Sequence, residues 1–130
     1  MVRLVLFVSA ALCSLSLVAQ GMPQAQPHQQ VKQLDAVVKL DGQQERDIER
    51  MLTDSREKTD KLYGRMQALK MALGGEIGPE FDEDAIREKA KALGELSGEL
   101  TAETALLQAR IQGALTDQQR RKLRQHAQPQ

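Results

Sequence analysis

The side chains most able to carry chemistry in this 130-residue chain are one cysteine, Cys13, and two histidines, His28 and His126. An activated nucleophile needs a base beside it and a third group that orients the base. Neither histidine lies on a predicted rigid element beside a serine and a carboxylate, and the many carboxylates are spread along the sequence. The chain also has no glycine-rich, lysine-containing loop that would cradle a phosphate. The sequence therefore predicts no catalytic residues, and we expect that the protein is not an enzyme.

Histidine also binds zinc and nickel, and His28 and His126 flank the two ends of the predicted helical region. They could meet in space, within one chain or between two chains. A site with two histidines would still need carboxylate ligands, and nothing in the spacing of the acidic residues supplies them. The acidic residues between 76 and 84 lack the ligand pattern of a calcium-binding loop. We therefore expect no bound metal or other cofactor, with His28 and His126 as the candidate ligands if zinc or nickel does bind.

Charge and aromatic content argue against nucleic acid as a partner. The chain has 18 lysine and arginine residues against 18 aspartate and glutamate residues, so no overall field attracts a polyanion. Beyond residue 19 the aromatic side chains are Tyr63 and Phe81, which are too few to stack successive bases. So little aromatic bulk also predicts a thin core for a single domain, which a second subunit would help to cover.

Arginine and methionine side chains recur along the first long predicted helix. Methionine adapts its shape to different partners, and long basic side chains cover apolar patches with their aliphatic stems. A surface of this kind suits weak binding of many unfolded chains, although an ordinary amphipathic helix has the same composition. The candidate client-binding residues are Arg46, Arg50, Met51, Arg56, Arg65 and Met66.

The first 19 residues have the pattern of a secretory signal peptide. A short basic start at residues 1–3 is followed by an apolar run at residues 4–19, after which polar residues and Pro23 begin. The run is shorter than the roughly 20 residues that span a membrane as a helix. We expect residues 1–19 to be a signal peptide that is removed on export; the alternative is that residues 4–19 remain as an inner-membrane anchor. Cys13 would leave with the signal peptide, so packing must stabilise the exported chain without disulfides.

Two five-residue segments, 75 residues apart, have the side chains that start helices. In Leu40-Asp41-Gly42-Gln43-Gln44, the aspartate can accept a hydrogen bond from a free backbone N–H of the first turn. The glutamine three positions later can reach back to the N–H of the cap, which completes a capping box. Leu115-Thr116-Asp117-Gln118-Gln119 has the same arrangement, with threonine as the cap. The residues predicted to form the two boxes, each behind an inward-pointing leucine, are Leu40, Asp41, Gln44, Leu115, Thr116 and Gln119.

Helical periodicity fills the sequence around the first box. Residues 20–30 are rich in glutamine and proline and are expected to be a disordered leader, followed by a short helix at 31–39. A long amphipathic helix is expected from the Asp41 cap to about Leu73, with Gly74 as its C-cap. Its predicted stripe toward the core consists of Ile48, Leu52, Leu62, Met66, Leu69 and Leu73, with Ser55 and Thr59 at the intervening steps.

A second long helix is expected from the Asp82 cap to about Ala114, with a last short helix after Thr116. The fold class is therefore all-α: a long antiparallel helical hairpin with short flanking helices, four helices in total. Met71 and Leu106 lie off the apolar stripes and are expected either to be exposed or to contact a second subunit. The stripe of the second long helix is predicted to consist of Ile86, Ala90, Leu93, Leu100, Leu107 and Ile111, with Ser97 and Thr104 at the polar steps. A ridge of small residues, which indicates either a close helix crossing or a loosely built surface helix, consists of Ala90, Gly94, Gly98 and Ala102.

The two capped segments resemble the twice-repeated Leu-Thr-x-x-Gln motif of the Spy/CpxP family of bacterial periplasmic proteins. The segment at 115–119 matches the motif in full, whereas Asp41 stands where threonine is usual and keeps the capping function. The resemblance covers residues 31–127, which we therefore expect to be a single Spy/CpxP-like helical domain. It implies a bent four-helix protomer that pairs into a thin, cradle-shaped homodimer.

The resemblance also implies a function. Members of the family act as ATP-independent periplasmic chaperones, as inhibitors of an envelope-stress sensor kinase, or as zinc- and nickel-responsive proteins. The shortage of histidines in this chain favours the chaperone branch. We therefore expect a periplasmic chaperone-like stress-response protein; the alternative is a periplasmic heavy-metal sensor or regulator of an envelope signalling system. The implied partners are unfolded or misfolded envelope proteins, a second copy of the chain, and a sensor kinase or an anti-sigma protein.

Overall fold

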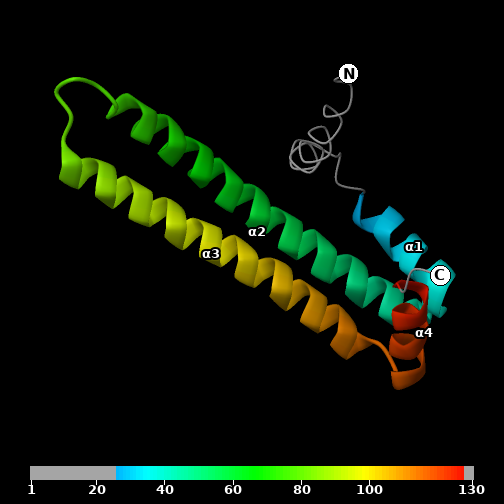
Figure 1. Cartoon of the computed structure of the whole chain (residues 1–130). Helices are drawn as coiled ribbons and strands as arrows, with labels where there is room; N and C mark the ends of the chain where they lie inside the picture. The colour runs from blue at the N-terminus through cyan, green and yellow to red at the C-terminus, as the bar shows by residue number, and fades with distance from the viewer. Residues whose placement is uncertain (1–25, 128–130) are drawn as a thin grey trace, which may run out of the picture.

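The computed structural model describes residues 26–127, and this part of the chain has four helices and no strand (Figure 1). The helices are α1 (Pro27–Val38), α2 (Gly42–Gly75), α3 (Glu83–Ala114) and α4 (Asp117–Ala127). Helices α2 and α3 form a long antiparallel hairpin, about 50 Å long at 1.5 Å per residue. Helices α1 and α4 contact each other at the open end of the hairpin. The predicted all-α fold is therefore confirmed.

Three predictions about the N-terminal region fall outside the described residues. They are the signal peptide at 1–19, its alternative as an anchor at 4–19, and the first part of the leader, residues 20–25. Between residues 26 and 127, no helix is both long enough and apolar enough to cross a membrane. The expected homodimer also stays a prediction, because the structure contains a single chain.

The predicted disordered leader extends too far, because residues 27–30 are the first turn of α1. Pro27 occupies the first turn, where the missing N–H of proline has no helical partner to lose. The carbonyl of Gln26 accepts hydrogen bonds from the N–H groups of Gln29 (2.8 Å) and Gln30 (3.1 Å). Val31, which is 3% exposed, then anchors the turn in the core. Packing therefore overrides a composition that is typical of disorder.

Helix α1 ends at a residue with an unusual backbone conformation. Lys39 has φ 60°, which is the left-handed region, and its N–H donates to the carbonyl of Asp35. The Asp35 carboxylate accepts the N–H of the next residue, Leu40, at 2.8 Å. These two hydrogen bonds reverse the chain into the cap of α2, and they hold a lysine where glycine is usual.

The α2 stripe lies against α3 as the sequence predicts. Ile48, Ser55 and Leu62 are buried, and the other predicted members of the stripe are half-buried. The predicted C-cap is wrong, because α2 runs through Gly74 to Gly75 and its cap is Glu76. Glu76 stays in the right-handed helical region, so the helix ends without the left-handed turn that a glycine cap provides.

The α3 face toward α2 is rotated relative to the predicted stripe. Leu96, which the predicted stripe omits, is 4% exposed, whereas the predicted members Ala90, Ser97 and Thr104 are exposed. Lys89 and Glu103 share the half-buried face with Leu96, because long charged side chains cover apolar surface with their stems. Glu103 also pairs with Lys58 of α2 at 3.8 Å. Sequence periodicity treats such residues as polar and so misplaces the centre of the face.

The ridge of small residues on α3 does not make a close crossing within the chain. Gly94 and Gly98 are exposed, and a Cβ atom added at either position would meet no atom within 4 Å. Of the two alternatives, a close helix crossing and a loosely built surface helix, residues 26–127 therefore show the second at these glycines. Met71 and Leu106, which lie off the stripes, are 80% and 45% exposed.

The hydrophobic core is concentrated where the four helices meet. Its buried members come from α1, from α2 and from the junction between α3 and α4, and the partly buried Leu52, Ile111 and Leu123 pack against them. Farther along the hairpin, α2 and α3 have only each other to pack against within residues 26–127. The buried members of the core are Val31, Val38, Ile48 and Leu115.

The left-handed conformation of Lys39 gives a stability prediction. We expect Lys39→Gly to raise the free energy of unfolding by about 1 kcal/mol, because glycine adopts φ 60° without a Cβ clash. The matched control is Lys32→Gly at an exposed position inside α1, which should lower it by about the same amount. Urea unfolding followed by circular dichroism measures both. Equal destabilisation by the two variants would contradict the turn described here.

Candidate functional site

The two capped segments meet at the open end of the hairpin through their glutamines. Nε2 of Gln44 donates to Oε1 of Gln119 over 2.8 Å, and Nε2 of Gln119 donates to Oε1 of Gln44 over 3.0 Å. Each Oε1 also accepts the backbone N–H of its own cap residue, from Asp41 at 3.0 Å and from Thr116 at 2.9 Å. The Asp41 and Thr116 side chains in turn accept the N–H groups of Gln44 and Gln119. Both predicted capping boxes are therefore present, and a reciprocal pair of amide hydrogen bonds joins them.

The second N–H of each glutamine amide satisfies a carbonyl at the end of another helix. Gln44 donates to the carbonyl of Ala114, the last residue of α3, over 2.9 Å. Gln119 donates to the carbonyl of Lys39, just after α1, over 2.8 Å. Every donor and acceptor of both amides is then used, and Gln119 is 8% exposed. This arrangement, which we call the glutamine pair, fixes the ends of all four helices relative to one another.

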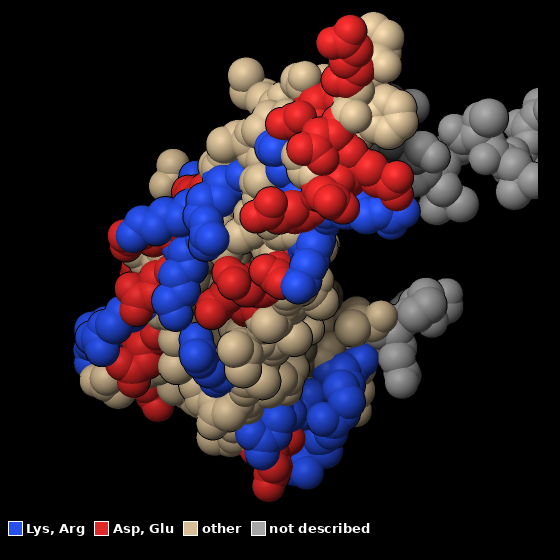
Figure 2. Space-filling model, turned by 90° about the vertical axis from the view of Figure 1, so that its left-hand side faces the viewer, with Lys and Arg blue, Asp and Glu red and all other residues tan. Residues whose placement is uncertain are grey.

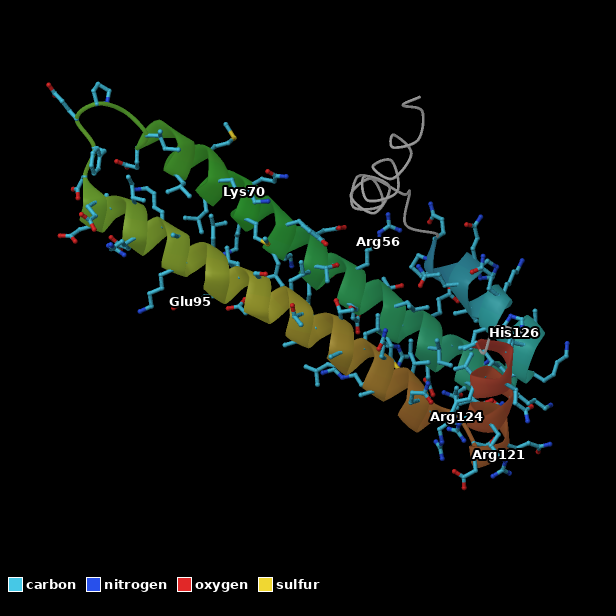
Figure 3. All side chains as sticks on the ribbon, viewed as in Figure 1. Arg56, Lys70, Glu95, Arg121, Arg124 and His126 are labelled. Carbon is cyan, nitrogen blue, oxygen red and sulfur yellow. The ribbon has the colours of Figure 1, made fainter. Side chains whose placement is uncertain are left out.

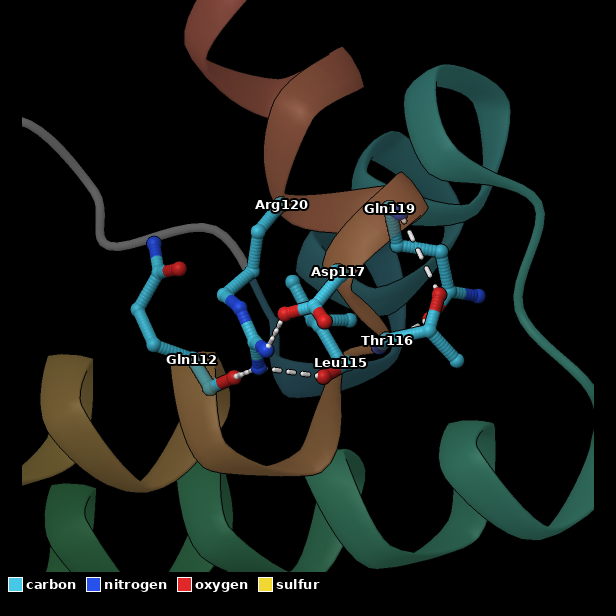
Figure 4. Close-up of polar contacts among 6 residues, drawn as sticks. All are labelled: Gln112, Leu115, Thr116, Asp117, Gln119 and Arg120. Atoms are coloured by element: carbon cyan, nitrogen blue, oxygen red, sulfur yellow. Dashed lines mark hydrogen bonds and ion pairs between the residues drawn. The ribbon is translucent and has the colours of Figure 1, made fainter.

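Arg120 ties the end of α3 to the start of α4 (Figure 4). Its Nη1 donates to the carbonyls of Gln112 (2.9 Å) and Leu115 (2.6 Å), and its Nη2 donates to Oδ1 of Asp117. The guanidinium thus sits at the negative end of the α3 dipole. The hydrogen bond from Arg120, and then its charge, hold the pKa of Asp117 below its usual 3.8. The sequence does not reveal this role of Arg120; its place directly after the second motif is the one feature that points to it.

A groove runs along the hairpin on the side where α1 packs. We call it the Arg56 groove; its volume is about 190 Å³. Leu52, Leu100 and Leu107 form its apolar wall, and Arg56 is its one charged lining residue. Figure 3 shows Arg56 on the same side of α2 as α1. The complete lining is Pro27, Gln30, Leu52, Ser55, Arg56, Thr59, Tyr63, Leu100, Thr104 and Leu107.

The lining of the Arg56 groove follows from helix geometry. On α2 the lining positions recur at steps of three or four residues, which places them along one edge of the stripe toward α3. On α3, Leu100, Thr104 and Leu107 follow the same rule and face them. Tyr63 is 47% exposed, so its ring borders the groove without closing it. From the sequence, the leucines are predicted stripe members, Arg56 is a candidate client-binding residue, and Pro27 and Gln30 belong to the predicted leader. Without the position of α1, nothing combines them into one groove.

The structure does not bring the six predicted client-binding residues onto one surface. Arg56 and Arg65 are nine residues apart, which is about two and a half turns of helix, so they lie on opposite sides of α2. Arg46 donates to Oε1 of Gln43 over 2.9 Å, and Arg50 pairs with Asp47 at 3.9 Å. The two methionines, Met51 and Met66, are half-buried. Arg56 alone among the six lines the groove.

The opposite side of the hairpin has a groove of different character. Its volume is about 370 Å³, and lysine, arginine and glutamate side chains line it together with Leu62 and Ala102. Most of its cations have anionic partners: Lys58 pairs with Glu103 at 3.8 Å, and Lys61 pairs with Glu57 at 2.7 Å. The charges of this side therefore largely offset one another, whereas no aspartate or glutamate lines the Arg56 groove.

Charged side chains are also sorted along the length of the hairpin. Figure 2, which views the molecule from the hairpin tip, shows acidic side chains gathered there. They include the exposed residues Glu80, Asp82 and Asp84. At the other end, α4 carries exposed basic residues, and Figure 3 shows Arg121 and Arg124 among them. The Arg56 groove lies between these two ends.

The two histidines lie in different surroundings. His28 is in the first turn of α1, not in a leader, and its Nδ1 lies 3.7 Å from Oε1 of Glu49. His126, in the last turn of α4, lines an open depression between α1 and α4 with Leu34 and Leu123. Within residues 26–127, no three histidine, cysteine or acidic side chains are grouped so that they could hold a metal ion. Comparisons of the chain with protein-family models, with curated proteins and with solved structures found no match.

The reciprocal hydrogen bonds of the glutamine pair predict strong coupling between distant positions. Gln44→Leu and Gln119→Leu each leave the other amide and a helix-end carbonyl unpaired, and each should cost about 1–3 kcal/mol of stability. The double variant should cost at least about 1 kcal/mol less than the sum, because both unpaired amides are gone. Chemical denaturation of the four proteins gives the coupling. As a control, Gln118→Leu, at an exposed position in the same motif, should change stability little. If the costs of Gln44→Leu and Gln119→Leu simply add in the double variant, the two amides are not paired.

The contact between Arg120 and Asp117 gives a prediction about pH. In the folded protein the pKa of the Asp117 carboxyl should lie below 3.8, and Arg120→Gln should move it upward, because the two largest lowering effects come from Arg120. A depressed folded pKa stabilises the fold above the unfolded pKa, and that contribution is lost as the pH falls through the folded value. Nuclear magnetic resonance of the carboxyl carbon measures the titration directly. An unchanged midpoint in Arg120→Gln would contradict the contact.

Proposed function

We propose that the protein is an exported, ATP-independent chaperone that holds partly unfolded envelope proteins along the Arg56 groove. The observation that carries the proposal is the groove itself. Three leucines and Tyr63 supply apolar surface in an open channel. The hydroxyl oxygens of Thr59 and Thr104, whose hydrogens are donated within their own helices, can accept hydrogen bonds from a partner. A chain that has lost its tertiary structure exposes apolar side chains and unpaired backbone groups together, so it matches both parts of this lining.

The size and openness of the groove favour unfolded chains over other ligands. A cavity of about 150 Å³ holds one benzene molecule, so a groove of about 190 Å³ accommodates one or two side chains of a larger partner. The driving force is the removal of apolar surface from water, which requires no nucleotide. Binding of this kind is weak and tolerant of sequence, as a holding chaperone requires.

The resemblance to the Spy/CpxP family supports the same proposal. The two motifs that carry the resemblance form the glutamine pair, and the hairpin that they close presents the groove. A periplasmic location, removal of residues 1–19 and pairing into a homodimer belong to this proposal. The heavy-metal alternative has no corresponding support, because His28 contacts Glu49 and His126 lines a different surface.

The proposal predicts that the exported protein suppresses aggregation. Protein purified after export should reduce light scattering by a chemically denatured test enzyme at near-stoichiometric ratios and without ATP. Tyr63→Ser should weaken this suppression, because it removes the most exposed apolar side chain of the groove. Leu106→Ser is the matched control, since Leu106 is similarly exposed at 45% but does not line the groove. Absence of suppression at about tenfold excess would end the proposal.

A further inference from the structure

The guanidinium of Arg56 stands out among the charged groups of α2. No ion pair or side-chain hydrogen bond joins it to another residue between 26 and 127, whereas Lys58 and Lys61, close by on α2, have carboxylate partners. Arg65 and Lys70 of α2 have no ion pair within these residues either, but both are exposed. Arg56 is half-buried, and it is the one charged residue among the ten that line the groove. The groove therefore has a net positive charge that nothing in its lining offsets.

A half-buried guanidinium beside apolar walls favours one kind of partner. Its planar array of N–H donors matches a carboxylate, which it can bind with two parallel hydrogen bonds. Partial exclusion of water strengthens that attraction relative to an exposed pair. Leu52, Leu100 and Leu107 meanwhile require an apolar group next to the charge. A single cation is too little to hold a nucleic-acid backbone, which is bound through several phosphates at once.

From this charge complementarity we propose that the Arg56 groove selects segments of unfolded chains in which an aspartate or glutamate is flanked by large aliphatic residues. The carboxylate pairs with Arg56, and an aliphatic neighbour packs between Leu52 and Leu107 on one side and Leu100 on the other. From Leu52 to Tyr63 the α2 lining spans about 16 Å, which an extended peptide covers in about five residues. This selectivity rests on the proposed holding function and names the client sequence that it prefers.

The chain carries its own reporter of groove occupancy. Tyr63 lines the groove, it is the only tyrosine, and the chain has no tryptophan. Intrinsic tyrosine fluorescence of the exported protein therefore comes from this one ring. A peptide without aromatic residues that occupies the groove should shield the ring, which is 47% exposed, from quenching by acrylamide.

The test compares three peptides that differ at one position: acetyl-Leu-Leu-Asp-Leu-Leu-amide and its asparagine and lysine counterparts. We expect the aspartate peptide to protect Tyr63 at a concentration at least about fivefold lower than the asparagine peptide, and the lysine peptide to protect least. This preference should weaken as salt is added, since salt screens the ion pair.

Two variants of Arg56 and one control locate the selectivity. Arg56→Gln should make the aspartate and asparagine peptides equal, and Arg56→Glu should reverse the order in favour of the lysine peptide. Arg65→Glu makes the same charge change half a turn around α2, outside the groove, and should leave the wild-type order intact. Circular dichroism confirms that each variant is folded.

The outcomes separate this inference from the proposed function. Equal protection by all three peptides, with aggregation suppression retained, overturns the selectivity and leaves the holding function standing. Protection by none of them overturns the selectivity whatever the aggregation assay gives, because the groove is then not the binding surface. If Arg65→Glu changes the ranking of the three peptides as much as Arg56→Glu does, the preference comes from overall charge. That result would overturn the role of Arg56.

Discussion

The reciprocal hydrogen bonds between Gln44 and Gln119 are the constraint on which the rest of the structure depends. Helix ends leave backbone groups without partners, and burying such groups unpaired is costly. Four helix ends meet at the open end of this hairpin, and the two amides supply partners to each of them. Each amide completes a capping box with its acceptor oxygen and satisfies a distant carbonyl with its donor nitrogen. One pair of side chains thereby joins segments that are 75 residues apart.

This closure explains how a chain with so little aromatic bulk can form a long hairpin. The buried side chains are concentrated beside the glutamine pair, where α1 and α4 cover the open end. Away from it, α2 and α3 pack as a two-helix layer whose surfaces remain accessible on both sides. The Arg56 groove starts at the covered end, where α1 supplies Pro27 and Gln30, and continues onto the exposed part of the hairpin. The closed end of the hairpin thus positions one wall of the groove.

Much of this architecture follows from residue types alone, and the exceptions have physical reasons. The caps and the α2 stripe are local features, so Asp41, Thr116 and Ile48 are predictable from spacing. Residues 27–30 are helical because Val31 is buried by other helices, which composition does not reveal. The α3 face centres nearer Leu96 because long charged side chains can lie on a helix interface. The groove combines three helices, so no single periodic pattern could place Pro27 of α1 and Leu107 of α3 beside Arg56.

Both proposals require that the hairpin binds unfolded chains on the α1 side. This binding is tested most directly by methyl resonances of the exported protein titrated with a permanently unfolded client. Binding on the α1 side should give the largest shifts at Leu52, Leu100 and Leu107, which line the Arg56 groove. Shifts concentrated instead at Ile77 near the hairpin tip, or at Leu123 and Val37 between α1 and α4, would contradict it.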